Sequence, residues 1–193
     1  DTERELARSL KARRCDALIV ASALAPDDTF YEQLQQEDLP VIAVDRSQSP
    51  GVISCVVSDN RKGAATLARS VLEPGTGSVV WLDAVPALAM TRERREGFEE
   101  VARSRSGQWA VYSGERYDRA SGARLMQQVL ADQGLPDALI TASYTLLQGV
   151  LDVLLEQPGG LPQSLRMATF GDDRLLDFLP VKVHSLPQKH EAI

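Results

Sequence analysis

Short apolar segments alternate along the chain with longer segments that carry apolar residues at helical spacing. We predict β-strands at residues 16–21, 40–44, 54–57, 78–82, 109–112, 138–141, 166–170 and 182–186. Short runs of Val, Ile, Leu and Ala suit the strands of a parallel sheet, which helices cover on both faces.

The segments between these strands predict helices. Leu6 and Leu10 lie one helical turn apart near the start of the chain. Asp27 or Asp28 is expected to cap a second helix and Asp59 a third, because a carboxylate accepts hydrogen bonds from the free N–H groups of a first turn. Further helices are expected at residues 89–104, 117–133 and 144–156. This alternation predicts an α/β protein with doubly wound parallel sheets on each side of a domain boundary.

Composition narrows the class of protein. The 193 residues are 44% hydrophobic and 25% charged, and no apolar run approaches the ~20 residues that a membrane span requires. A formal net charge of −6 argues against a surface that binds nucleic-acid phosphates, so any DNA contact is expected from a segment outside this chain. Cys15 and Cys55 form no metal-binding or redox motif, which favours a reducing, cytoplasmic setting.

Polar side chains follow several predicted strands, at the ends where parallel sheets bind ligands. Asp45 and Arg46 follow one strand, Ser143 follows another, and Asp172 and Asp173 follow a third. Hydroxyls, carboxylates and a guanidinium suit a polyol, and the forked guanidinium of Arg46 also suits a phosphate. The plainer alternatives are a solvated charge pair at Asp45 and Arg46, and a helix-capping role for one of the two later aspartates.

A run of charged residues at 92–96 contains a further candidate. Arg94 lies three residues before Gly97 and therefore on the same helix face, which is expected to direct it into a cleft. Arg92 and Arg95 are expected on the solvated face.

Motifs of catalysis and cofactor binding are missing from the sequence. The turn at residues 75–77 lacks the third glycine of a dinucleotide fingerprint, and neither a phosphate loop nor a G-x-S-x-G elbow occurs. His184 and His190 are six residues apart, which matches no common zinc spacing on one helix face. We therefore expect no catalytic residue, no cofactor and no metal ion.

Several segments together resemble the effector domains of LacI-type transcription regulators. They are Asp16–Val20, Pro40–Arg46, Val57–Asn60, Arg94–Phe98, Pro136–Thr141 and Phe170–Asp173. Their order and spacing match over nearly the whole chain. The longer strings at residues 141–150 and 168–179 are similar to the fructose-responsive branch of that family.

The resemblance implies a periplasmic-binding-protein-like fold of two subdomains. Residues 1–57 would form part of the first subdomain, residues 58–188 the second, and residues 189–193 the start of a helix that returns to the first. The first two strands of such a domain would precede this chain, so the strand at 17–21 is expected to be a sheet edge.

The resemblance also implies a function. Such a protein senses a sugar phosphate, here fructose 1-phosphate, in the cleft between its subdomains. It acts as a homodimer that binds operator DNA through a helix-turn-helix outside this chain. The ligand-binding positions of the family fall on Asp45, Arg94, Ser143, Asp172 and Gln188, and we add Arg46 as a candidate phosphate partner.

Two other classes of protein remain open. A sugar-binding protein of a transport system shares the two-lobed fold, and a signal peptide encoded at the start of the gene would favour it. An enzyme acting on phosphosugars would need Asp172 or Asp45 as a general base, together with a nucleophile and oxyanion donors that the sequence does not reveal.

Overall fold

A computed structural model describes residues 2–187, which divide into two compact units. The first unit ends at Ser58 and the second begins at Asp59, one residue after the boundary expected from the sequence. Each unit contains its own parallel sheet, which confirms the predicted α/β class. Within the described residues, no helix is long and apolar enough to cross a membrane.

The first unit is a three-stranded sheet with two helices. Its elements are α1 (Thr2–Ala12), β1 (Leu18–Val20), α2 (Phe30–Gln36), β2 (Val41–Val44) and β3 (Ser54–Val56). The strands are parallel in the order β1-β2-β3. Within residues 2–187, β1 therefore lies at an edge of the sheet. Ala7 of α1 and Leu34 of α2 pack in one apolar cluster with the strands. The Tyr31 hydroxyl donates a hydrogen bond of 2.7 Å to the Glu3 carboxylate and joins the two helices.

The opposite face of this small sheet carries exposed apolar side chains. Ile19 is 73% exposed, and Ile42 and Val56 on the other two strands are also exposed. Ile19 and Ile42 are neighbours in the register of β1 and β2. The expectation that every strand is covered on both faces is therefore wrong for this unit within residues 2–187, because both helices pack on the same face.

The second unit is a five-stranded sheet with helices on both faces. Its elements are α3 (Asn60–Val71), β4 (Ser78–Ala84), α4 (Ala89–Arg103), β5 (Gln108–Gly114), α5 (Arg119–Gln133), β6 (Ala138–Thr141), α6 (Tyr144–Leu155), β7 (Arg166–Phe170), the 3₁₀ helix η1 (Arg174–Phe178) and β8 (Val183–Leu186). All strands are parallel, in the order β5-β4-β6-β7-β8. This is the 2-1-3-4-5 order of one kind of doubly wound sheet.

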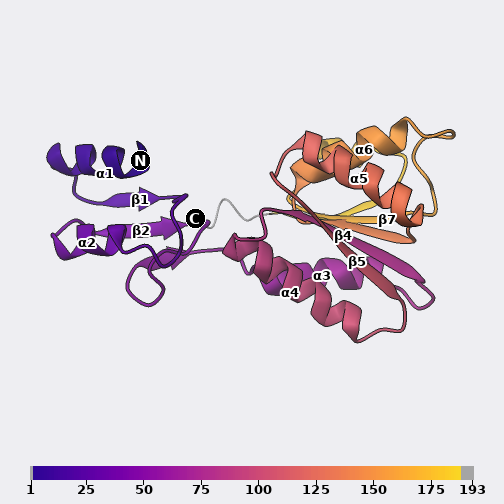
Figure 1. The fold of residues 1–193 in the computed structure, drawn as a ribbon, viewed down its shortest axis with the longest axis horizontal. Helices are drawn as coiled ribbons and strands as arrows, with labels where there is room; N and C mark the ends of the chain where they lie inside the picture. The colour runs from indigo at the N-terminus through magenta and orange to yellow at the C-terminus, as the bar shows by residue number, and fades with distance from the viewer. Residues whose placement is uncertain (1, 188–193) are drawn as a thin grey trace. The chain divides into compact units, whose positions relative to one another are not determined.

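Helices α3 and α4 cover one face of this sheet, and α5 and α6 cover the other (Figure 1). On the face of α3 and α4, the core contains Trp81 stacked on Phe98, with ring centroids 5.2 Å apart. On the face of α5 and α6, the core contains Leu82 and Leu139. Trp81 and Leu82 belong to different layers because successive residues of a strand point to opposite faces.

Aspartate side chains accept backbone hydrogen bonds at the starts of α2 and α3. Asp59 accepts a hydrogen bond of 3.1 Å from the backbone N–H of Lys62, which confirms the predicted cap of α3. Asp28 accepts from the backbone N–H of Phe30 at 2.9 Å, although the residue that directly precedes α2 is Thr29. The aspartates of the sequence therefore mark both helix starts to within two residues.

Helices α3 and α4 approach each other closely because Gly97 has no side chain. A Cβ atom at this position would lie 2.0 Å from the backbone carbonyl oxygen of Arg61. The close approach brings Asn60, at the start of α3, within hydrogen-bond distance of the second turn of α4.

Candidate functional site

Three of the predicted site residues gather at one edge of the five-stranded sheet. Ser143 follows β6 and Asp172 follows β7, both at the carboxyl ends of these strands. Arg94, on α4, lies at the same edge, where its guanidinium contacts Ala142 and Phe170 at those two strand ends. Carboxyl ends of parallel strands are the usual ligand-binding edge of such a sheet.

The guanidinium of Arg94 is buried and held on several sides. The residue is 3% exposed. Its Nε donates to Asn60 Oδ1 at 2.9 Å, and Nη1 donates to the carbonyl oxygen of Ala142 at 2.6 Å. The guanidinium also lies over the ring of Phe170, 4.1 Å from the centroid. These contacts offset the cost of burying a charge and hold the side chain in one orientation.

Ser143 and the two aspartates after β7 have different local roles. The Ser143 hydroxyl accepts a hydrogen bond of 3.3 Å from the backbone N–H of Leu146 and so caps α6. Asp173 caps η1 by accepting from the N–H of Leu175 at 2.8 Å, whereas Asp172 is exposed. Asp173 therefore has the capping role expected of one of the pair.

Asp45 and Arg46 lie at the corresponding edge of the first unit, directly after β2. Asp45 has a positive φ of 63°, a conformation that aspartate tolerates better than most residues, and its N–H donates to the Val56 carbonyl at 2.9 Å. Arg46 is half-buried, and its Nη1 donates to the carbonyl oxygen of Ser22, after β1, at 3.4 Å. The carboxylate of Asp45 is exposed. Gln188, the sixth predicted site residue, lies outside the described residues.

The structure places Arg95 differently from the sequence-based expectation. It was expected on a solvated helix face, but its Nε and Nη2 donate to the carboxylate of Asp83 at 2.9 and 2.7 Å. Asp83 is 0% exposed and also accepts from the indole N–H of Trp81 at 2.9 Å. Helical spacing offered a signal, since Arg95 lies four residues after Thr91 and three before Phe98, both of which are buried.

The sequence did not reveal a strained turn at this edge. Val85, directly after β4, has a φ of +48°, which for a β-branched residue costs about 1–3 kcal/mol. Its N–H donates to the Gly114 carbonyl at 3.0 Å. Nearby, the Thr91 hydroxyl donates to the Ala84 carbonyl at 2.9 Å and lies 2.8 Å from the Tyr117 hydroxyl. Burial raises the pKa of Tyr117 above the ordinary tyrosine value.

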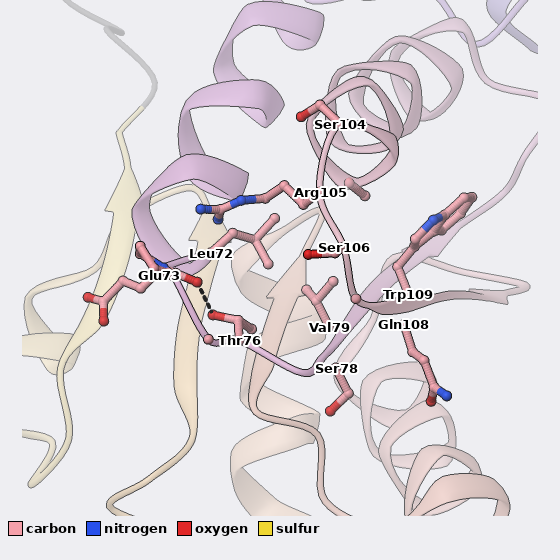
Figure 2. A pocket seen from close by; sticks show the side chains of 14 residues that line it. Leu72, Glu73, Thr76, Ser78, Val79, Ser104, Arg105, Ser106, Gln108 and Trp109 are labelled. Atoms are coloured by element: carbon pink, nitrogen blue, oxygen red, sulfur yellow. Dashed lines mark hydrogen bonds between the residues drawn. The ribbon is translucent and has the colours of Figure 1, made fainter.

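A pocket at the opposite, amino-terminal edge of the same sheet is a weaker candidate (Figure 2). It has a volume of about 260 Å³ and lies between the segments that join α3 to β4 and α4 to β5. The Thr76 hydroxyl donates to the carbonyl oxygen of Glu73, whose carboxylate accepts from Arg166 at 3.0 Å. These polar groups stabilise the loops by bonding to neighbouring protein groups.

Metal ligands do not gather in the described part of the chain. Among residues 2–187, no group of three or more His, Cys, Asp or Glu side chains is placed to hold a metal ion. The polar groups of the candidate edge are instead a guanidinium, hydroxyls and a carboxylate, which suit hydrogen bonding to an anionic or hydroxylated ligand.

Known proteins resemble this chain closely. Over 191 residues it is 46% identical to the fructose operon regulatory protein of Vibrio cholerae, covering 99% of this chain and 58% of that protein. Over 193 residues it is 33% identical to the catabolite repressor/activator of Escherichia coli, covering 100% of this chain and 58% of that protein. The chain thus spans somewhat more than half the length of these relatives.

Solved structures and a family model agree with these relatives. The Cra transcriptional dual regulator of Pseudomonas putida, solved in complex with fructose 1-phosphate, is 45% identical and superposes with a TM-score of 0.91 over 100% of this chain and 71% of that one. A sugar ABC transport substrate-binding protein of Bordetella parapertussis shares the fold at 18% identity, with a TM-score of 0.77 over 90% of this chain and 55% of that one. The model of the periplasmic binding proteins and sugar binding domain of LacI family matches residues 1–161. The chain therefore belongs to the family of periplasmic binding proteins and LacI-type sugar-binding domains.

Proposed function

We propose that this chain is the sensing part of a bacterial transcription regulator and that its ligand is fructose 1-phosphate. The observation that carries the proposal is the buried Arg94 at the ligand-binding edge of the second sheet, held at both Nε and Nη1. A forked guanidinium in a fixed orientation is suited to a phosphate. The Pseudomonas putida relative with bound fructose 1-phosphate supports the choice of sugar phosphate.

The proposed ligand contacts are four residues that follow strands, and Arg94 of α4. Asp45 and Arg46 would serve from the first unit, and Arg94, Ser143 and Asp172 from the second. The exposed carboxylates suit sugar hydroxyls, and the guanidinium groups suit the phosphate. Gln188 remains a proposed contact outside the described residues.

We propose a wider regulatory function by analogy with the named regulators among the relatives. Ligand binding would change how two copies of the protein present their DNA-binding segments, which lie outside this chain. The ligand can shift that equilibrium only by its difference in affinity for the two states. Homodimerisation, operator binding, a cytoplasmic location and the lack of catalysis are all parts of this proposal. The names of the relatives, a fructose operon regulatory protein and a catabolite repressor/activator, support the regulatory role.

Calorimetric titration of the full-length protein tests the proposal. Fructose 1-phosphate should bind with a Kd of about 1 μM or tighter, roughly −8 kcal/mol, and fructose and fructose 1,6-bisphosphate serve as controls. Arg94→Lys keeps the charge but loses the fork, so it should weaken binding by more than about tenfold. Operator binding by the variant, measured separately, should persist and would show that it is folded.

Two results would contradict the proposal. Absence of fructose 1-phosphate binding by the unaltered full-length protein would exclude the proposed ligand. Unchanged affinity and normal release from operator DNA in the Arg94→Lys variant would exclude Arg94 as a ligand contact.

A further inference from the structure

A single amide side chain joins α3 to two consecutive residues of α4. Asn60 is the first residue of α3 and is 4% exposed. Its Oδ1 accepts from Nε of Arg94 at 2.9 Å, and its Nδ2 donates to the carboxylate of Glu93 at 2.8 Å. The amide is therefore placed at the base of the guanidinium that we propose to bind phosphate.

The chemistry of its neighbours permits only one orientation of this amide. Nε of Arg94 can only donate a hydrogen bond, and the carboxylate oxygen of Glu93 that faces Asn60 accepts one. A rotated Asn60 amide would set its NH₂ group against the guanidinium and its oxygen against the carboxylate. The observed orientation satisfies both neighbours, so the amide is fixed from two sides.

The contact at Nε controls the plane of the guanidinium. Nε and Nη1 lie in that plane, and hydrogen bonds to Asn60 and to the carbonyl of Ala142 restrain it at two separate atoms. The ring of Phe170 supports the flat face, 4.1 Å from the guanidinium carbon. Loss of Asn60 would remove the restraint at Nε and so increase the freedom of rotation about the Cδ–Nε bond.

We propose that Asn60 is a positioning residue that orients the guanidinium of Arg94 for the phosphate of the ligand. The proposal rests on the proposed function for its ligand, whereas its effect on Arg94 is independent of any ligand. Immobilising a flexible side chain before binding removes an entropic cost of binding, so loss of Asn60 should weaken affinity by roughly fivefold to tenfold.

The test uses full-length protein labelled with [¹⁵N]arginine. The Nε–H signal of Arg94, identified by its loss in Arg94→Lys, should be protected from exchange with water in the unliganded protein. Asn60→Ala should remove this protection and weaken fructose 1-phosphate binding as stated. Urea unfolding of the variant checks that the second unit remains folded.

A swapped pair provides the matched control. In the double variant Asn60→Asp with Glu93→Gln, the carboxylate at position 60 can accept from Arg94, and the amide at position 93 can donate to that carboxylate. Both hydrogen bonds are then retained, and only the bond between positions 60 and 93 reverses its direction, so the protected signal and the affinity should both recover. The single variant Asn60→Asp should recover less, because it sets two carboxylates against each other.

The outcomes separate this inference from the proposed function. Unchanged protection of the Arg94 signal in Asn60→Ala, or a folded swapped pair that fails to restore it, would overturn the positioning role. Loss of this protection with unchanged affinity for fructose 1-phosphate would also overturn the positioning role, because ligand binding would then not depend on the contact between Asn60 and Arg94. If unaltered protein binds no fructose 1-phosphate, the proposed function fails, and the exchange measurement still decides whether Asn60 orients Arg94.

Discussion

The substitution Gly97→Ala tests the close approach of α3 and α4. The added Cβ would lie 2.0 Å from the carbonyl oxygen of Arg61, against the 3.4 Å at which ordinary contact begins, a shortfall of about 1.4 Å. The carbonyl carbon of Arg61, at 2.8 Å, is also too close, so the clash is with backbone that cannot rotate away.

Two opposing contributions determine the expected loss of stability. Alanine favours a helix over glycine by about 1 kcal/mol. Forcing two packed elements apart costs typically about 1–3 kcal/mol, and a backbone clash of this size belongs at the upper end. The free energy of unfolding of the second unit should therefore fall by about 2 kcal/mol.

Tryptophan fluorescence during urea unfolding measures this change selectively. Both tryptophans, the buried Trp81 and the partly exposed Trp109, belong to the second unit. Glu96→Ala, at an exposed position of the same helix, is the matched control and should change stability by less than about 0.5 kcal/mol. A Gly97→Ala protein as stable as the control would refute the close approach of the two helices.

Two further predictions concern charged groups of the second unit. Arg95→Ala leaves the carboxylate of Asp83 buried without its cation and should lower the free energy of unfolding by roughly 3–5 kcal/mol. The control Arg92→Ala should change this free energy by less than about 0.5 kcal/mol. Equal effects of the two substitutions in urea unfolding would contradict the buried ion pair. Burial, together with the charge of Lys182, lowers the pKa of His184, so the folded state disfavours the protonated imidazole. Stability should therefore fall as the pH drops below the ordinary histidine pKa of about 6.5 toward the lowered value, and His184→Gln should flatten this dependence. An identical pH dependence in the variant would exclude His184 as its source.

The sequence predicted the order of the elements well because each element has a strong local signal. Apolar runs marked all eight strands of the described residues, and Asp59 marked the start of α3. The 3₁₀ helix η1 was missed because five residues are too few to show a helical period. The exposed face of the first sheet was also missed, since covering a face depends on which segments pack there rather than on the strand itself.

The candidate site was predictable only in part. Gly97 indicated the face on which Arg94 lies, and residues after the strand ends indicated Ser143 and Asp172. Nothing in the sequence revealed the hydrogen bond between Asn60 and Arg94, because these residues are 34 positions apart and belong to different helices. The left-handed backbone of Val85 was equally hidden, since a β-branched residue is among the least expected there.

The burial of Arg94 means that residues at the proposed ligand-binding edge differ in how freely they can be substituted. Replacement of Arg94 would disturb the packing of α4 against the strand ends as well as the proposed phosphate contact. Asp172 is exposed at the same edge, and its side chain can change without opening a cavity in the core. If Asp172 contacts the sugar and Arg94 the phosphate, as proposed, a substitution at Asp172 can change the preferred sugar at little cost in stability, whereas a substitution at Arg94 changes ligand binding and stability together.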